Sequence, residues 1–150
     1  LPERFELSYA NEKGDKERPV VIHRAISGSL ERFMGVMIEH FAGAFPLWLS
    51  PVQVKILPIS EKHAEYAKEV YQKLLNFEIR VELDASNESL GKRIRVAKIE
   101  KVPYLLVLGD KEVEAGTVTS ERRDGEHREA LPLQEFIAST IAGSTSKEIW

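Results

Sequence analysis

The sequence predicts an α/β domain with a mixed β-sheet flanked by helices, preceded by a β-hairpin and one further helix. Three observations support this fold class. From residue 52 onward, strand-like apolar runs and amphipathic helical patterns follow the order β-α-β-α-β-β-β-α. Residues 104–108 are continuously apolar, as expected for a central strand covered on both faces. Residues 1–43 offer only a hairpin and a helix, too little to complete a sheet.

The composition is that of an ordinary globular protein. Of 150 residues, 43% are hydrophobic and 30% charged, which suggests one domain or a small domain with an appendage. The net charge of -3 means that any nucleic-acid-binding patch must be local. The absence of cysteine excludes disulfides and thiolate chemistry. With no signal-peptide pattern and no run of membrane-spanning length, we expect a cytoplasmic protein without a membrane partner.

The N-terminal pattern predicts a hairpin that leads into a helix. Residues 5–9 alternate like a half-buried strand, residues 11–18 are polar, and residues 20–22 are β-branched and apolar, as in a buried strand. Ser29 can cap the following helix and Gly43 can end it. The helix is predicted by apolar residues that share one face: Leu30, Phe33, Met34, Met37, Ile38 and Phe41.

Residues 46–51 form a predicted linker. Pro46 and Pro51 forbid a continuous helix, and the apolar residues between them indicate that the linker packs against the protein. We therefore divide the chain into residues 1–45, a linker at 46–51, and a domain at 52–150, of which residues 52–141 are expected to fold alone.

The second domain is predicted element by element from its periodicity. Ser60 and Ser89 can cap its first two helices, and Pro132 opens the last one. A turn signal at residues 123–126 predicts a hairpin, and the tail from residue 143 is expected to fray. The expected strands cover residues 52–56, 79–83, 104–108, 117–120 and 127–131, and the expected helices cover residues 61–76, 90–101 and 132–141.

Residues 28–33, Gly-Ser-Leu-Glu-Arg-Phe, resemble motif 3 of the class II aminoacyl-tRNA synthetases. The flanking runs 23–25 and 39–54 resemble the threonyl-tRNA synthetase family, and the likeness continues to residues 111–114. The resemblance implies that residues 1–45 end a class II catalytic domain whose motifs 1 and 2 are absent from this chain. It implies that residues 52–150 are the anticodon-binding domain shared by the threonyl, prolyl, glycyl and histidyl enzymes.

The motif 3 resemblance implies a contact with ATP by Ser29 and Arg32, with Arg32 as the catalytic candidate. A helix N-terminus with an arginine suits phosphate, although a solvated surface arginine is the equal alternative. The resemblance makes His23 one of three zinc ligands, whereas a lone histidine is more often structural. The other two ligands are missing, so we expect neither ATP nor zinc on this chain alone. Surface or structural positions are expected for His40, His63 and His127.

The predicted helix 90–101 is basic, with Glu100 as its only acid. Such a helix is either a solvated face or a footprint for RNA phosphates. The candidate phosphate contacts are Lys92, Arg93 and Lys98.

The resemblance places anticodon recognition at Asn87, Arg95, Lys101 and Glu112. Amides and carboxylates pair with the edges of unstacked bases, which is how single-stranded RNA loops are recognised. The plainer alternatives are a turn residue for Asn87 and a surface acid for Glu112. Lys101 stands where arginine is usual in the bacterial enzymes, and Glu121 stands at a position that is basic in some relatives.

Together these observations predict a ligase fragment of the threonyl-tRNA synthetase family that binds the anticodon loop of threonine tRNA. The alternative is a stand-alone tRNA-binding accessory module without catalysis. The intact motif 3 and His23 favour the fragment. ATP, threonine and a homodimeric state are expected of the full-length enzyme, and this chain alone is expected to be inactive.

Overall fold

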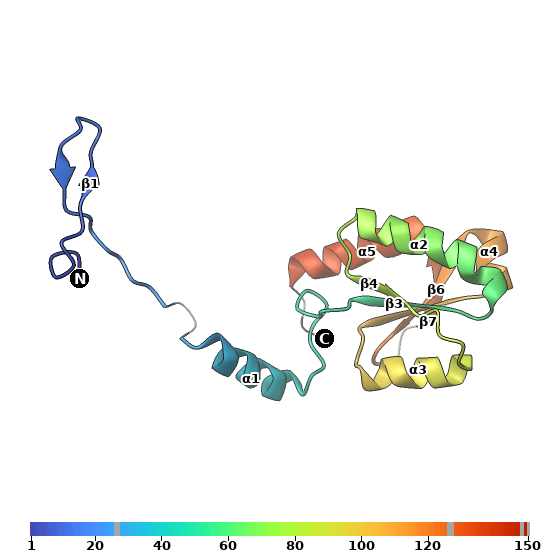
Figure 1. Ribbon diagram of the computed structural model, residues 1–150. Coiled ribbons are helices and arrows are strands. Elements are labelled where there is room, and N and C mark those ends of the chain that lie inside the picture. The colour runs from blue at the N-terminus through green and yellow to red at the C-terminus, as the bar shows by residue number, and fades with distance from the viewer. Residues whose placement is uncertain (26–27, 126–127, 148, 150) are drawn as a thin grey trace. The chain divides into compact units, whose positions relative to one another are not determined.

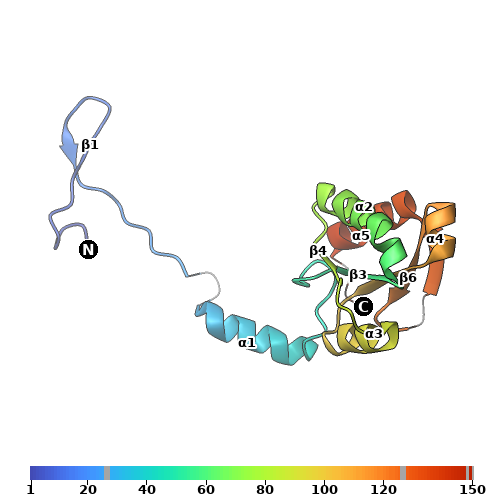
Figure 2. The ribbon, with the colours of Figure 1, turned by 45° about the vertical axis from the view of Figure 1, so that its right-hand side comes forward.

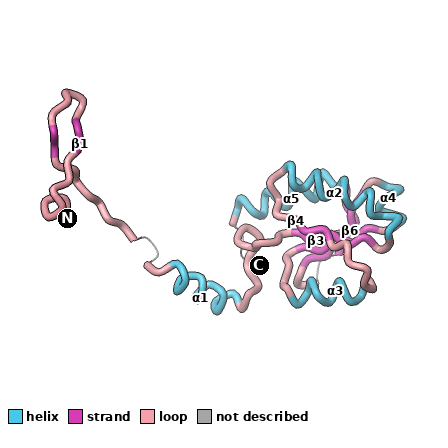
Figure 3. Tube along the Cα trace, in the orientation of Figure 1, coloured by secondary structure: helices cyan, strands magenta, loops and turns pink. Residues whose placement is uncertain are grey.

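The computed structural model describes residues 1–25, 28–125, 128–147 and 149, which fall into two compact units, residues 1–36 and 37–150 (Figure 1). Figure 3 marks the helices and strands along the chain. Within these described ranges, no helix is both long enough and apolar enough to span a membrane.

The first unit contains a small hairpin, β1 (Tyr9–Ala10) and β2 (Lys16–Glu17), paired antiparallel. A hairpin was expected, but its strands are shorter than predicted: the first overlaps the expected strand 5–9 only at Tyr9, and the second lies before residues 20–22. Residues 20–22 form no strand, and Val20 and Ile22 are 88% and 87% exposed. A buried strand needs a hydrogen-bonded neighbour and an apolar cover, and the described part of this unit supplies neither.

The helix α1 (Leu30–Phe41) forms as predicted. The Ser29 hydroxyl accepts a hydrogen bond from the Arg32 amide at 3.4 Å and donates to Glu31 at 2.7 Å, so Ser29 caps the helix. At the other end Gly43 has φ +77° and donates its amide to the Ile38 carbonyl, which confirms the glycine stop. No side chain of α1 is buried.

The second unit is built on a mixed five-stranded sheet, and the mixed sheet was predicted from the sequence. Its strands lie in the order β4-β3-β5-β6-β7. Strand β3 pairs parallel with both β4 and β5, whereas β5, β6 and β7 pair antiparallel. The strands are β3 (Val54–Pro58), β4 (Val81–Leu83), β5 (Tyr104–Leu108), β6 (Thr117–Arg122) and β7 (Arg128–Pro132).

Helices cover both faces of this sheet (Figures 1 and 2). On one face, α2 (Ala64–Asn76), which follows a 3₁₀ turn at Glu61–His63, and α5 (Leu133–Ser146) bury the larger core. On the other face, α3 (Leu90–Ile99) covers a smaller core that includes Leu57 and Leu105. Successive crossovers from β3 and β4 therefore run over opposite faces.

Three details differ from the sequence prediction. A short helix, α4 (Asp110–Ala115), lies between β5 and β6, where no element was expected, because six residues are too few to show an apolar period. Helix α5 continues to Ser146 instead of fraying at residue 143. The first strand of this unit was expected at residues 52–56, but β3 covers Val54–Pro58. It is buried along its whole length because it has a strand on each side and helices over each face.

The buried strand β3 contains a charged residue, Lys55. Its ammonium contacts Glu100 at 2.7 Å and Glu82 at 3.4 Å. Burial alone would lower the pKa of Lys55, but the hydrogen bond to Glu100 and the charge of Glu82 raise it above its ordinary value. The lysine therefore remains charged in the sheet.

The linker packs as predicted. Leu47 is 1% exposed, and its carbonyl accepts a hydrogen bond from the Gln53 side chain at 3.0 Å. The Arg80 guanidinium donates to the Trp48 and Ser50 carbonyls at 2.9 and 2.8 Å. These contacts make residues 46–51 an integral part of the second unit.

Candidate functional site

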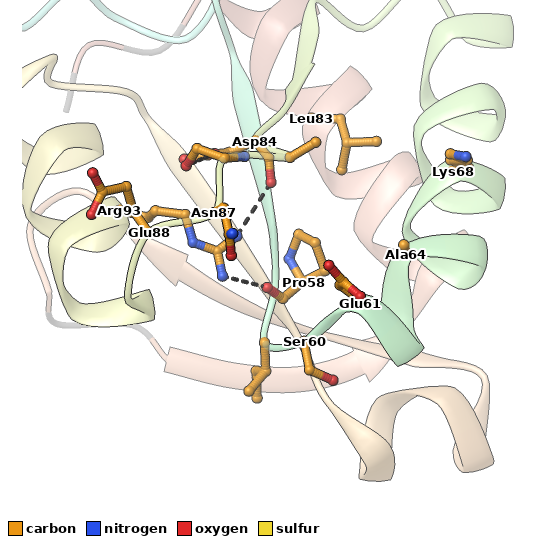
Figure 4. A pocket seen from close by; sticks show the side chains of 13 residues that line it. Pro58, Ser60, Glu61, Ala64, Lys68, Leu83, Asp84, Asn87, Glu88 and Arg93 are labelled. Carbon is orange, nitrogen blue, oxygen red and sulfur yellow. Dashed lines mark hydrogen bonds between the residues drawn. The ribbon is translucent and has the colours of Figure 1, made fainter.

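The carboxyl ends of the parallel strands β3, β4 and β5 meet at one edge of the sheet. From this edge β3 leads to α2 over one face, whereas β4 leads to α3 over the other. Open α/β sheets bind their ligands at such a divergence of loops. A cavity of about 170 Å³ lies here, lined mainly by residues 58–61 and 83–88 (Figure 4).

The loop that carries Asn87 is shaped by the acid that begins it. Asp84 Oδ1 accepts hydrogen bonds from the Ser86 amide at 2.9 Å and the Ser86 hydroxyl at 2.6 Å. Burial favours neutral Asp84, but the Ser86 bonds and the charge of Arg93 hold its pKa below the ordinary value. Asn87 is exposed on this loop and lines the cavity.

Arg93 lies beneath the cavity and does not face solvent. The residue is 6% exposed, and its two terminal nitrogens donate to the Pro58 carbonyl at 2.6 Å and the Asp84 carbonyl at 3.2 Å (Figure 4). The structure therefore differs from the expectation that Arg93 contacts RNA phosphate. Helical periodicity turns this side chain toward the core, and two backbone carbonyls occupy its guanidinium.

The exposed side of α3 carries Lys92, Arg95 and Lys98, spaced by three as predicted. Lys92 pairs with Glu88 at 2.7 Å, and Lys98 pairs with Glu121 at 2.6 Å. Among the residues that the structure describes, Arg95 has no ion-pair or hydrogen-bond partner. Acids outside the helix thus neutralise part of a charge that looks unopposed in the sequence.

Lys101 lies beyond the far end of α3 from Asn87. A ten-residue helix is about 15 Å long, so these two predicted anticodon residues do not form one cluster. The Lys101 backbone has φ +57°, and its ammonium donates to the Ala42 carbonyl. The neighbouring acid Glu100 forms an ion pair with Lys55 at 2.7 Å.

Glu112 is the third residue of α4, and both of its carboxylate oxygens accept hydrogen bonds from within the protein. One oxygen accepts the Gly109 amide at 2.8 Å, which caps the helix, and the other accepts the Thr119 hydroxyl at 2.7 Å. Burial would raise the pKa of Glu112, but the hydrogen bonds from Thr119 and Gly109 hold it below the ordinary value. Each oxygen retains a second lone pair that could accept from RNA.

His63 ties α4 to the loop that follows β3. The histidine is 5% exposed, and its Nδ1 accepts the Ser60 amide at 3.2 Å. Since an amide can only donate, the ring proton lies on Nε2, which donates to Asp110 at 2.9 Å. The hydrogen bond from His63 lowers the pKa of Asp110.

His63 was expected only at a surface or structural position, and this network was not predicted. The signal was present, because Ser60 and His63 have the spacing of a capping box. His40 is exposed in the last turn of α1, where its ring meets the edge of Phe41. His127 lies outside the described residues.

In the first unit, Ser29, Arg32 and His23 are all exposed. Arg32 stands in the first turn of α1, where a phosphate would meet free amides. Within the described ranges, no three metal-binding side chains gather closely enough to hold an ion. His23 alone does not make a zinc site.

The second unit thus combines a mixed sheet, polar loops at the carboxyl ends of its parallel strands, and a helix with an exposed basic side beside them. Residues 53–141 match the family model described as the anticodon binding domain, which is more than half of the chain. The chain belongs to the anticodon-binding domain family.

The chain is also similar to curated threonine–tRNA ligases. It is 51% identical over 142 residues to the ligase of Carboxydothermus hydrogenoformans and 54% identical over 138 residues to that of Sulfurihydrogenibium sp.. These matches cover 95% and 92% of the chain but only 22% of each relative. The resemblance to the threonyl-tRNA synthetase family, predicted from residues 23–54, is confirmed.

Two solved structures are also similar to this chain. The RNA binding domain of threonyl-tRNA synthetase from Cryptosporidium parvum has a TM-score of 0.75 and 40% identity, covering 94% of this chain and 36% of that one. Prolyl-tRNA synthetase of the same organism has a TM-score of 0.66 at 22% identity, and the match covers 97% of this chain and 31% of that one. The second likeness shows the fold alone.

Proposed function

We propose that this chain recognises the anticodon loop of threonine tRNA as part of a longer threonine–tRNA ligase. The observation that carries the proposal is the parallel sheet edge, where Asn87 follows β4 and Glu112 follows β5 in a domain of the anticodon-binding family. Both side chains offer hydrogen-bonding groups suited to the edges of unstacked bases. The named relatives are the reason for choosing threonine tRNA.

The remaining RNA contacts divide by chemistry. Arg95 is exposed without a partner in the described structure, and its planar guanidinium suits base stacking or a bidentate bond. Lys92 would exchange Glu88 for a phosphate at modest cost, because both side chains are exposed. The same exchange by Lys98 would cost more, because its partner Glu121 is only 13% exposed and would lose its counter-ion. Lys101 would contact the anticodon loop from the far end of α3.

Residues 1–45 would belong to the catalytic domain of the full-length ligase, joined through the linker 46–51 to the anticodon-binding domain at 52–150. There Ser29 and Arg32 would contact ATP, with Arg32 stabilising phosphate charge. His23 would supply one zinc ligand of the full-length enzyme, but the described residues hold no group of three metal-binding side chains, so this chain alone does not fit zinc. A cytoplasmic, homodimeric enzyme is proposed for the full-length protein only.

This assignment predicts that the chain alone does not form threonyl-adenylate, because motif 2 supplies the other ATP contacts in the class. Threonine-dependent pyrophosphate exchange by the purified chain is the measurement. Exchange above a buffer blank that disappears in Arg32→Ala would contradict the prediction. The alternative, a stand-alone binding module, predicts a native protein no larger than this chain, which mass determination from its source decides.

Anticodon recognition itself is tested by filter binding to two stem-loops that differ in one anticodon base, each at two salt concentrations. Asn87→Ala should lower the preference for the threonine anticodon by about 1–3 kcal/mol, by analogy with bidentate base contacts in DNA. Lys92→Gln, the matched phosphate variant, should weaken both RNAs alike and reduce the salt slope by about one. Equal binding of both stem-loops by the unaltered chain would overturn the proposal.

A further inference from the structure

Arg93 links the carboxyl ends of strands β3 and β4, which are followed by loops that run in different directions. Its Nη2 donates to Pro58, the last residue of β3, and its Nη1 donates to Asp84, just beyond β4 (Figure 4). The chain beyond Pro58 turns toward α2, and the chain beyond Asp84 turns toward α3 on the opposite face. Besides the backbone hydrogen bond from the Asp84 amide to the Ile56 carbonyl at 3.0 Å, Arg93 therefore supplies a further link between these departing segments.

The segment that needs holding is residues 84–88. Asp84 receives support at three atoms: its amide donates to Ile56 at 3.0 Å, its carboxylate accepts from Ser86, and its carbonyl accepts from Arg93. Asn87 follows directly, exposed at the rim of the cavity. The direction of the Asn87 amide thus depends on a turn whose start is anchored from beneath.

We propose that Arg93 is a positioning residue for anticodon recognition, which holds the 84–88 loop so that Asn87 faces the RNA, without contacting the RNA itself. The inference rests on the proposed function of the same site. Its role replaces the phosphate contact expected from the sequence, since a side chain 6% exposed cannot reach a phosphate.

Arginine suits this role for a geometric reason. Its planar guanidinium presents two terminal nitrogens at fixed separation, so one side chain can bridge two carbonyls. The third nitrogen, Nε, is buried and has no partner among the described residues, so the two carbonyl bonds alone orient the group. Lysine would keep the charge but carry its donors on a single nitrogen, which cannot span both strand ends in the same way.

The test uses the full chain and two anticodon stem-loops, cognate and singly mismatched. Arg93→Lys should reduce the ratio of cognate to mismatched affinity by about tenfold, while binding to the mismatched RNA changes little. Arg93→Met, which removes the buried charge, is the second variant if Arg93→Lys does not fold. Lys73→Met, at an exposed lysine of α2, is its control for the loss of one positive charge. Melting curves ensure that every variant is folded at the assay temperature.

Hydrogen exchange without RNA supplies the readout that separates this inference from the proposed function. Faster exchange confined to residues 84–88 in Arg93→Lys supports positioning, even if the unaltered chain binds both RNAs equally and the proposed function fails. Where the unaltered chain discriminates between the two RNAs, a preserved affinity ratio in a folded variant overturns the inference, whether or not the exchange of residues 84–88 changes. A lower melting temperature with preserved ratio and loop exchange also overturns it, since Arg93 would then be merely structural.

Discussion

Replacing Glu112 by glutamine tests whether this carboxylate belongs to the fold, to the RNA site, or to both. Glutamine keeps one oxygen and puts an amide nitrogen in place of the other, so it cannot accept from both Gly109 and Thr119. The Thr119 hydroxyl can reverse and accept from that amide, but the charge is lost. Since a hydrogen bond to a charged group contributes about 1.5–3 kcal/mol and this site is only partly buried, we expect a loss of about 1–2 kcal/mol.

The pH dependence of this loss follows from the lowered pKa of Glu112. A carboxyl with a folded pKa below its ordinary value of 4.5 adds stability above that value and loses it as pH falls through the folded pKa. Glutamine does not titrate. The gap in unfolding free energy between the two proteins should therefore be full at neutral pH and should narrow as the pH falls below 4.5.

Urea unfolding at neutral pH and at acidic pH measures both effects. Glu114→Gln is the matched control. Glu114 lies exposed on the same helix, and its substitution removes the same charge. If the two variants differ by less than about 0.5 kcal/mol at neutral pH, the capping argument is refuted. Filter binding tests the role of Glu112 in RNA recognition. If Glu112 recognises a base, Glu112→Gln should lose affinity for the cognate tRNA alone. If Glu112 merely repels RNA, the variant should bind every tRNA more tightly.

Two further predictions concern packing. A Cβ at Gly109 would lie 2.7 Å from Ile59 Cδ1, the end of a side chain that is 48% exposed and can move, so Gly109→Ala should cost only about 0.5–1.5 kcal/mol. Gly91→Ala, in open space on α3, should stabilise by about 0.5–1 kcal/mol, and thermal melts that rank the pair otherwise contradict the reasoning. A fragment starting at residue 52 should be about 2–4 kcal/mol less stable than one starting at residue 37, because it lacks buried Leu47 and its hydrogen bonds. Equal urea midpoints and slopes for the two fragments would refute this.

The sequence alone was sufficient for features that depend on local spacing. The helix α1, its Ser29 cap and its glycine stop were predicted because capping and amphipathic periodicity are properties of neighbouring residues. The mixed sheet followed from the order of apolar runs and helices, and the family resemblance followed from residues 23–54. Asn87 and Glu112 could be named as candidates by resemblance, before their surroundings were known.

Only the tertiary structure decided which polar groups are available. Arg93 and Lys92 are adjacent cations in the sequence, yet one is fixed between two carbonyls and the other is exposed. Lys98 meets Glu121, which is distant in sequence and comes from β6. The physical reason is that burial and charge pairing depend on which elements become neighbours, and periodicity along one element carries no information about the groups that another brings to it.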